Sequence, residues 1–343
     1  MHMADALISP AVGGVLWAGS ALTAAYAVRK MRYELEDKKI PLMGVMGAFV
    51  FAAQMINFTI PGTGSSGHIG GGMLLAILLD PFAGFLTMTS VLLIQALFFA
   101  DGGLLAFGCN LFNMGFFTCF VAYPLIYRLL IRKNTSKKRL ALASILSVVV
   151  ALQMGAFSVV LETVLSGKTE LPFTAFVLFM QPIHLAIGFV EGLITSAVVI
   201  FLREARPDLI INGADPSKKA WSYKRVLAIL VIFTLLTGAL FSWFASSNPD
   251  GLEWAIEKVT GASEQKSSED IHKTLGRIQD KTAILPDYQF KENSEENNSL
   301  VQNVGTSVSG LAGSAMTLVL VTVITLSILV IKKRREPQSR DVK

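Results

Sequence analysis

Residues 173–202 read FTAFVLFMQPIHLAIGFVEGLITSAVVIFL, a stretch in which only His184 and Glu191 are ionisable. A helix of about 20 apolar residues crosses the hydrocarbon core of a bilayer, so this stretch is long enough to span a membrane. Similar apolar runs recur along the 343-residue chain, of which 52% is hydrophobic and only 16% charged. Soluble domains carry about 25% charged residues. The sequence therefore excludes an ordinary soluble enzyme and a disordered chain, and it predicts a polytopic membrane protein.

Nine apolar segments, one of them short, predict an all-α fold. Residues 1–203 are expected to form a membrane helical bundle of about seven spans. A cytoplasmic linker, residues 204–220, joins it to a two-span helical hairpin, residues 221–343, which has an outer loop (246–308) and a basic cytoplasmic tail. The expected segments are residues 7–28, 42–60, a short run ending at Leu79 before Asp80-Pro81, 82–99, 104–130, 140–161, 173–202, 226–244 and 311–331.

The lysines and arginines orient these segments, because four groups hold 23 of the 30 basic residues. Nine spans place all four groups on one side, which the positive-inside rule makes the cytoplasmic side. The amino terminus is then outside, as an uncleaved span, and the carboxyl terminus is cytoplasmic. Basic residues placed beside apolar runs indicate a lipid bilayer rather than a nucleic acid as partner. The groups are residues 29–39, 128–139, 203–225 and 332–343.

Met1, His2 and His68 are candidate metal ligands. A free amine at Met1, the His2 backbone nitrogen and the His2 imidazole can chelate one ion through fused five- and six-membered rings. His68 lies in the stretch GSSGHIGGG (64–72) on the same outer face and can supply a fourth nitrogen. Four nitrogens in a square suit Ni(II) or Cu(II). The alternative interpretation is a loose terminal residue and an ordinary loop histidine, since two histidines 66 residues apart define no motif.

Four other polar residues are candidates for supporting roles. His184 and Glu191 are seven residues apart and share one face of a helix. Such an intramembrane ionisable pair indicates function, with a hydrogen-bonded interhelical contact as the alternative. Asn57 and Asn110 lie near the outer face, where they could orient a metal ligand or join helices. The outer loop adds negative charge there, with eleven acidic against six basic residues, which favours cations.

Several enzyme motifs can be tested against the sequence. No His-Glu-x-x-His sequence occurs, so the zinc protease motif is excluded. The string SGKT (166–169) ends like a phosphate-binding loop, but Glu162 stands where its first glycine belongs, and no nucleotide site is expected. The string GSSG (64–67), with His184 as a base, leaves an intramembrane serine protease as an alternative. A stand-alone divalent-cation channel or secondary carrier, with His184 and Glu191 as its pathway, is another.

Four segments of the first 203 residues carry distinctive patterns: MHMADALISP (1–10), FAAQMINF (51–58) with Gly67-His68, DGGLLAFGCN (101–110) with NMG (113–115), and HLAIG (184–188) with EGLIT (191–195). In this order they resemble the signatures of the CbiM/NikM family, the substrate-specificity subunits of energy-coupling-factor nickel and cobalt transporters. A fifth segment, SNPDGLEW (247–254), is similar to the signature of the PDGLE domain, the N component, which is a separate subunit in related systems.

The resemblance implies that Met1 (amine), His2 (amide and imidazole) and His68 (imidazole) hold the metal in square-planar fashion. It implies high-affinity capture of Ni(II), or of Co(II), from outside the cell. It also implies that the chain is not itself an enzyme. A transmembrane coupling subunit and two ATPase subunits would drive import.

Overall fold

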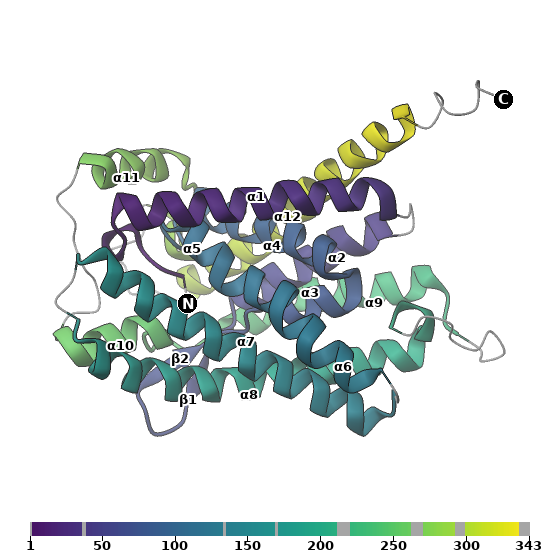
Figure 1. Ribbon diagram of the computed structural model, residues 1–343, viewed down its shortest axis with the longest axis horizontal. Coiled ribbons are helices and arrows are strands. Elements are labelled where there is room, and N and C mark those ends of the chain that lie inside the picture. Colours follow the sequence, from purple (N-terminus) through teal and green to yellow (C-terminus); the bar gives the residue numbers. More distant parts are fainter. Residues whose placement is uncertain are drawn as a thin grey trace.

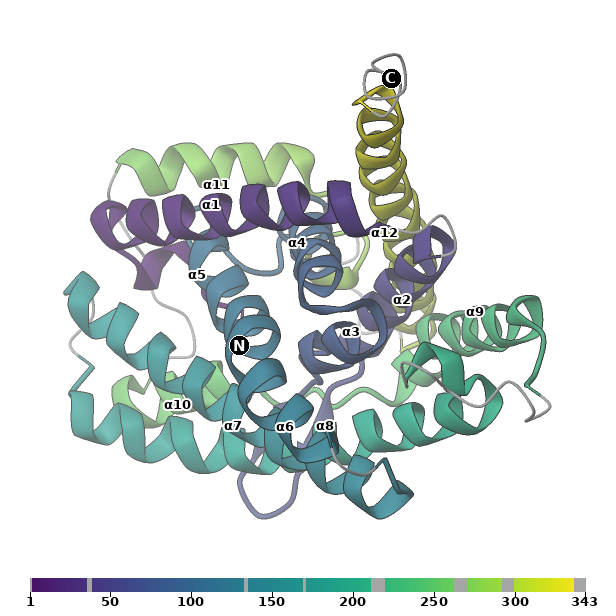
Figure 2. The same ribbon diagram turned by 45° about the vertical axis from the view of Figure 1, so that its right-hand side comes forward.

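The structure is a computed structural model that describes residues 2–35, 39–132, 135–168, 171–210, 220–261, 270–291 and 299–335. Within these ranges nearly all regular structure is helical, and strands occur only as the short pair β1 (Phe58–Ile60) and β2 (Ser65–Gly67). Long helices packed side by side make up most of the molecule (Figures 1 and 2). The predicted all-α membrane fold is confirmed.

The helical elements follow the expected order along the chain. They are η1 (Asp5–Leu7), α1 (Pro10–Glu34), α2 (Lys39–Gln54), α3 (Gly72–Leu79), α4 (Pro81–Phe98), α5 (Phe107–Leu111), the π-helix η2 (Phe112–Tyr127), α6 (Arg128–Ile131), α7 (Lys137–Ser166), α8 (Phe173–Ala205), η3 (Pro207–Leu209), α9 (Tyr223–Ala239), η4 (Phe241–Phe244), α10 (Gly251–Thr260), α11 (Asp270–Thr282), η5 (Pro286–Tyr288) and α12 (Ser299–Arg335).

Six helices of the described chain are long and apolar enough to cross a membrane. The remaining three predicted segments are shorter helices, α2, α3 and α9. The predicted break at Asp80-Pro81 is present. Asp80 has a positive φ of 86°, and its carboxylate caps α4 by accepting hydrogen bonds from the backbone N–H groups of Phe82 (2.9 Å) and Ala83 (3.0 Å). α3 and α4 therefore pack against each other as a tight helical pair.

The second predicted segment was too long. α2 ends at Gln54, and residues 58–60 instead pair antiparallel with residues 65–67, Phe58 lying opposite Gly67. The turn between these strands places Gly62 and Gly64 at a φ of +78°, which a residue without a Cβ adopts readily. The apolar residues at the end of this segment thus belong to a hairpin rather than to a membrane helix.

The outer loop was also more structured than expected. Its described parts contain α10, α11 and η5, and α12 starts at Ser299, well before the predicted residue 311. α11 lies beside α1 in both views (Figures 1 and 2), and the His272 Nε2 atom is 3.0 Å from the carbonyl oxygen of Ile8. Residues 211–219 of the predicted linker and 336–343 of the predicted tail lie outside the described residues.

The hairpin helices α9 and α12 pack along α2. Small residues bring the backbones close at this contact. A Cβ on Gly313 would stand only 2.0 Å from the Phe51 ring, and the Ser314 hydroxyl donates a hydrogen bond to the Ala48 carbonyl (3.2 Å). Close approach of this kind is typical of helix pairs within membranes. The second part of the chain is therefore packed directly against the helix that leads into the β1–β2 hairpin.

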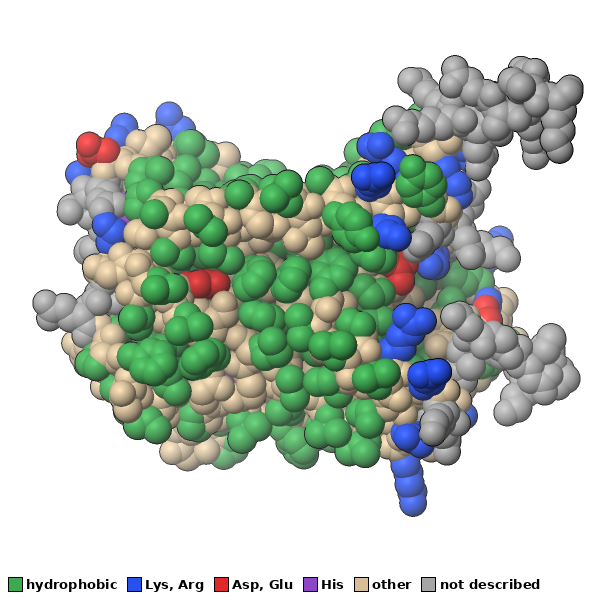
Figure 3. All heavy atoms as spheres, in the orientation of Figure 1, with side chains coloured by type: hydrophobic (Ala, Val, Ile, Leu, Met, Phe, Trp, Pro, Cys, Tyr) green, Lys and Arg blue, Asp and Glu red, His purple; other side chains and the backbone are tan. Residues whose placement is uncertain are grey.

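Charged side chains are unevenly distributed over the surface. In Figure 3 most of the visible lysines and arginines lie at the right-hand end of the molecule, around the C-terminal ends of α1 and α12 and around α6, and a smaller group lies at the upper left, around α11. The middle of the visible face is mainly hydrophobic. A broad apolar band with most of the basic residues beyond one edge of it is the pattern expected of a protein embedded in a bilayer. The chain is a multi-pass membrane protein.

Candidate metal site

The segment that precedes α1 runs into the bundle rather than along its surface. Met3 is fully buried, and its backbone carbonyl accepts a hydrogen bond from Gly103 N–H at 2.9 Å. The Asp5 carboxylate accepts one from Ala106 N–H at 2.9 Å. Two contacts with residues about 100 positions away hold the start of the chain against the loop that precedes α5. His2 is thereby fixed inside the protein, whereas Met1 lies outside the described residues.

Asn110 binds the same segment from α5. Its Oδ1 accepts a hydrogen bond from Met3 N–H at 2.7 Å, and its Nδ2 donates one to the Met3 carbonyl at 3.2 Å. One side-chain amide thus satisfies both backbone groups of Met3. Asn110 therefore positions the backbone next to His2; a role of Asn110 in metal binding stays a prediction.

His68 follows β2, and its backbone is held by Glu191 of α8. The buried Glu191 carboxylate accepts hydrogen bonds from Gly70 N–H (2.7 Å) and Gly71 N–H (2.9 Å). From the other side, the Gln54 side chain donates to the Gly70 carbonyl at 2.7 Å. The two N–H groups lie just before α3, where a helix presents free donors, so a buried carboxylate is well placed there. Glu191 therefore fixes the loop that carries His68.

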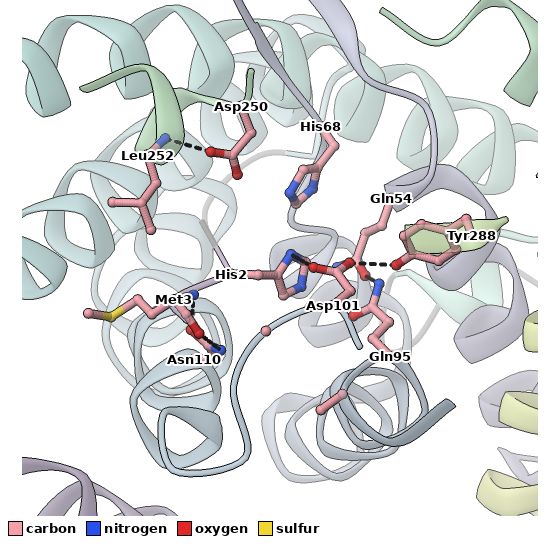
Figure 4. A network of polar contacts seen from close by, with 12 residues as sticks. His2, Met3, Gln54, His68, Gln95, Asp101, Asn110, Asp250, Leu252 and Tyr288 are labelled. Carbon is pink, nitrogen blue, oxygen red and sulfur yellow. Dashed lines mark hydrogen bonds and ion pairs between the residues drawn. The ribbon is translucent and has the colours of Figure 1, made fainter. Parts of the chain in front are cut away.

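The fold brings His2 and His68 together. Their ring centroids are 5.1 Å apart, and the ring planes differ by 17°. Metal–nitrogen bonds are about 2 Å long, so one ion can reach a nitrogen of each ring at this separation. The Nδ1 atom of His2 is 3.2 Å from Oδ1 of Asp101, whose Oδ2 accepts a hydrogen bond from the Tyr288 hydroxyl at 2.5 Å. Figure 4 shows these side chains converging on one point.

Burial sets the protonation of this cluster. It lowers the pKa of His2 to about 3 and that of His68 to about 4. Burial also raises the pKa of Asp101. Both imidazoles are consequently neutral near pH 7, and the neutral ring is the form that binds a metal ion.

The segment around Asp250 closes the site from the second part of the chain. The β1–β2 hairpin donates to it twice, from Ser66 N–H to the Pro249 carbonyl (2.8 Å) and from the Ser66 hydroxyl to the Asn248 carbonyl (2.8 Å). In return, the Trp254 indole donates to the Thr63 carbonyl at 3.0 Å. The hairpin before His68 is therefore tied to residues 248–254.

An acid-lined cavity of about 350 Å³ leads to His2 between the two parts of the chain. Both parts contribute carboxylates, which give the cavity a negative potential attractive to cations. Its acidic lining residues are Asp5, Asp101, Asp250, Glu253 and Asp287.

The other two candidates have different surroundings. His184 is buried, and its Nδ1 is 2.8 Å from the Met180 carbonyl. It shares the inward face of α8 with Glu191, as expected, but Glu191 binds the glycine loop instead of forming a pair with it. Asn57 contributes its backbone carbonyl, which accepts a hydrogen bond from Ser246 N–H at 2.7 Å, and its side-chain oxygen is buried without a hydrogen-bond partner in the described structure.

Sequence reasoning did not single out Asp101 or Asp250 as site residues. Asp101 lies in the third family signature and Asp250 in the PDGLE segment. Their presence in these two motifs was the one sequence signal that could have pointed to them as site residues. Tyr288 and Gln95 lay outside every motif. Only the fold brings Tyr288 to Asp101 and sets the Gln95 side chain against Gln54, to which it donates at 2.7 Å.

In the described part of the chain, no three His, Cys, Asp or Glu side chains are grouped closely enough to hold a metal ion. An ion held by His2 and His68 would therefore need further donors of another kind, such as backbone or terminal nitrogens. These elements define a class: a polytopic helical membrane protein with a buried two-histidine site that an acidic cavity approaches.

Comparison with known proteins gives the family. The cobalt uptake substrate-specific transmembrane region (CbiM) matches residues 2–209, and the PDGLE domain matches residues 224–330. The chain belongs to the CbiM family and carries a fused PDGLE domain.

Similar proteins are metal transporters rather than enzymes. The fused nickel transport protein NikMN of Rhodobacter capsulatus is 30% identical over 76% of this chain and 77% of its own. A chain from Archaeoglobus fulgidus, also named as a fused NikMN, is 32% identical over 93% of this chain and 96% of its own. The crystal structure of a truncated transition metal transporter, 33% identical, covers 60% of this chain and 99% of that chain with a TM-score of 0.53. The present chain is a metal transport protein of the membrane.

Proposed function

We propose that this chain captures Ni(II), or Co(II), with high affinity outside the cell and delivers it as the substrate-binding subunit of an ATP-driven energy-coupling-factor transporter. A coupling subunit in the membrane and two ATPase subunits supply the energy. The observation that carries the proposal is the buried contact between His2 and His68, which share no local sequence and meet only because the amino-terminal segment enters the bundle. Family membership and the nickel and cobalt transporters among its relatives support the substrate.

The proposed ligands are the Met1 amine, the His2 backbone and imidazole nitrogens, and the His68 imidazole. The six-membered chelate ring uses Nδ1 of His2, the atom that stands 3.2 Å from Asp101 in this structure. An ion on Nδ1 replaces the contact with Asp101 and requires that the single proton of the neutral ring lie on Nε2. The His2 amide nitrogen loses its proton when it binds the ion, and the Asp101 carboxylate lies near enough to the chelate to take up that proton. Four nitrogens in a plane favour Ni(II) over Co(II).

The proposed orientation puts the site outside and the basic end in the cytoplasm. The larger group of lysines and arginines, at the right-hand end of the molecule in Figure 3, supports this through the positive-inside rule. The acid-lined cavity beside His2 is then the approach from the outer face. We assign metal capture to residues 1–203, a linking role to 204–220, and control of access to 221–343, whose residues 248–254 cover the hairpin before His68.

Two measurements test the function. Purified full-length protein should bind one Ni(II) ion per chain, and His2→Ala should lose most of this affinity while His272→Gln, a change at the histidine that contacts Ile8, should not. In cells, nickel uptake should require co-expressed coupling and ATPase subunits. Uptake by this chain alone, at the same rate, would instead indicate a stand-alone channel or carrier.

A further inference from the structure

A second, smaller cavity is lined in part by His68. It has a volume of about 10 Å³, close to the minimum that holds one water molecule. Two imidazoles and one carboxylate line it, those of His68, His184 and Asp250, together with the backbone of Gly251. Figure 4 shows the Asp250 carboxylate and the His68 ring facing the same space. The cavity is separate from the acid-lined approach, although Asp250 borders both.

His184 lines this space and has one ring nitrogen that makes no hydrogen bond in the described structure. Its Nδ1 is 2.8 Å from the Met180 carbonyl, an oxygen that can only accept, so Nδ1 carries the proton. Its Nε2 is buried and has no hydrogen-bond partner in the part of the chain that the structure describes. Gly251 lets the backbone approach this ring, since a Cβ there would stand 3.2 Å from Cε1 of His184. A histidine that donates one N–H to a backbone carbonyl and offers its other nitrogen has the arrangement usual for a metal ligand.

His68 has the same arrangement. Its Nδ1 is 3.0 Å from the Ile69 carbonyl, which leaves Nε2 as the nitrogen that can bind an ion. His68 thus borders the cavity that contains His184 and also contacts His2. An ion bound to His68 can exchange its other ligands without leaving this ring.

We propose that His68, His184 and Asp250 form a second position for the divalent cation, to which the ion passes from the terminal chelate while it remains on His68. This rests on the proposed function. No three such side chains in the described structure stand at ligand distances, so binding at this position requires His184 and Asp250 to move toward His68. His184 is eleven residues into α8, about 16 Å along the helix from Phe173, which places the second position inward of the helix end.

The PDGLE domain supplies the carboxylate of this position. Asp250 also caps α10, where its Oδ1 accepts hydrogen bonds from Leu252 N–H and Glu253 N–H, both at 2.8 Å. Asp250→Asn keeps an oxygen for this cap and removes the negative charge. This variant therefore tests the effect of the Asp250 charge on ion binding while the cap of α10 is kept.

The experiment uses purified full-length protein and Co(II) as a probe with visible absorption. His2→Ala should abolish planar high-affinity Ni(II) binding and leave one weaker Co(II) site. Adding His184→Gln should weaken that residual Co(II) binding by about tenfold or more, and adding Asp250→Asn should weaken it less. Adding His272→Gln is the matched control and should have no effect. Residual Co(II) binding that His184→Gln leaves unchanged, or no residual binding at all, would overturn the second position.

A single His184→Gln variant guards against a purely structural effect. Its high-affinity Ni(II) binding should stay close to that of the wild type, which shows that the fold and the terminal chelate are intact, while nickel uptake with partner subunits should fall by about tenfold. Equal loss of capture and uptake would mean that His184 only supports the fold, contrary to the proposal. Failure of the proposed function is distinguishable, because it would appear as His2→Ala leaving Ni(II) affinity unchanged.

Discussion

The side chain of Asn110 satisfies both backbone groups of Met3, accepting from its N–H at 2.7 Å and donating to its carbonyl at 3.2 Å. The contact joins α5 to the start of the chain across 107 residues. This contact fixes the backbone beside His2. The position of the amino-terminal segment therefore depends on the Asn110 side chain, which need not bind the metal ion itself.

Replacing Asn110 should therefore weaken metal binding without removing a ligand. Asn110→Ala should lower Ni(II) affinity by about 10- to 100-fold, the range usual for residues that orient metal ligands. Asn57→Ala is the matched control, because no hydrogen bond of the Asn57 side chain is found in the described structure. Equilibrium Ni(II) titration of both purified variants checks this, and equal affinities in the two would contradict the role given to Asn110.

Glu191 should affect both stability and metal binding. Glu191→Gln replaces one acceptor oxygen with a donor that faces a backbone N–H of the glycine loop, and leaving a buried group unsatisfied costs about 1–3 kcal/mol. Thermal unfolding in detergent should show a lower Tm, and Ni(II) affinity should fall because the loop of His68 loosens.

Glu162→Gln is the control for this variant. Glu162 is also a buried carboxylate, but it accepts hydrogen bonds from Asn113 (2.8 Å) and Ser158 (3.0 Å), away from the His68 loop. We expect it to lower the Tm with little change in Ni(II) affinity. The same loss of affinity in both variants would show that the Glu191 effect is not specific to the loop.

The lowered pKa values predict how stability depends on pH in the absence of metal. An ordinary histidine titrates near 6.5, whereas His2 does so at about 3 and His68 at about 4 in the folded protein. Between pH 6.5 and these values the unfolded chain binds more protons, so stability is complete above this window and falls as the pH falls through it. The Tm of the metal-free protein should drop as the pH is lowered from 7 to 4, and His68→Gln should reduce that drop. A Tm independent of pH over this range would mean that the imidazoles are not buried as described.

Ser66 distinguishes transport from proteolysis. Its hydroxyl donates a hydrogen bond to the Asn248 carbonyl and so links the β1–β2 hairpin to the PDGLE domain. Ser66→Ala should cost about 1 kcal/mol of stability, the usual contribution of one hydrogen bond, and should leave metal binding in place. Differential scanning calorimetry of the purified variant measures the loss of stability, and Ni(II) titration measures metal binding. Loss of cleavage of a reporter membrane protein in this variant would instead support the serine protease alternative.

Apolar patterning predicted most of the fold because the backbone of each membrane helix must form its hydrogen bonds within the helix. Each span is therefore a long continuous run of apolar residues that can be recognised in the sequence. It failed at residues 55–60, where a strand that packs on the bundle is as apolar as a helix. Asp80-Pro81 was readable because capping and a proline at the start of a helix are local effects.

The site was only partly accessible from sequence. His2 and His68 could be proposed as ligands from their chemistry, but their contact depends on hydrogen bonds of Met3 and Asp5 to residues about 100 positions away. The spacing of apolar residues along the sequence does not predict hydrogen bonds between residues so far apart. For the same reason the motif containing Glu191 could be noticed, while its hold on the His68 loop required the packing of α8 beside α3.

The most direct test of the central claim is the geometry of bound Ni(II) when the terminal amine is moved. The wild-type protein should bind one ion in a diamagnetic, square-planar complex. A variant with Met-Ser-Gly-Ser-Gly placed before Met1 keeps both imidazoles and displaces the amine, and neither its second nor its third residue is a histidine. Its Ni(II) affinity should fall by about 100-fold or more, with loss of the square-planar absorption, while its Tm without metal remains near that of the wild type. Unchanged affinity and an unchanged square-planar spectrum in the extended protein would contradict capture of the metal by the amino terminus.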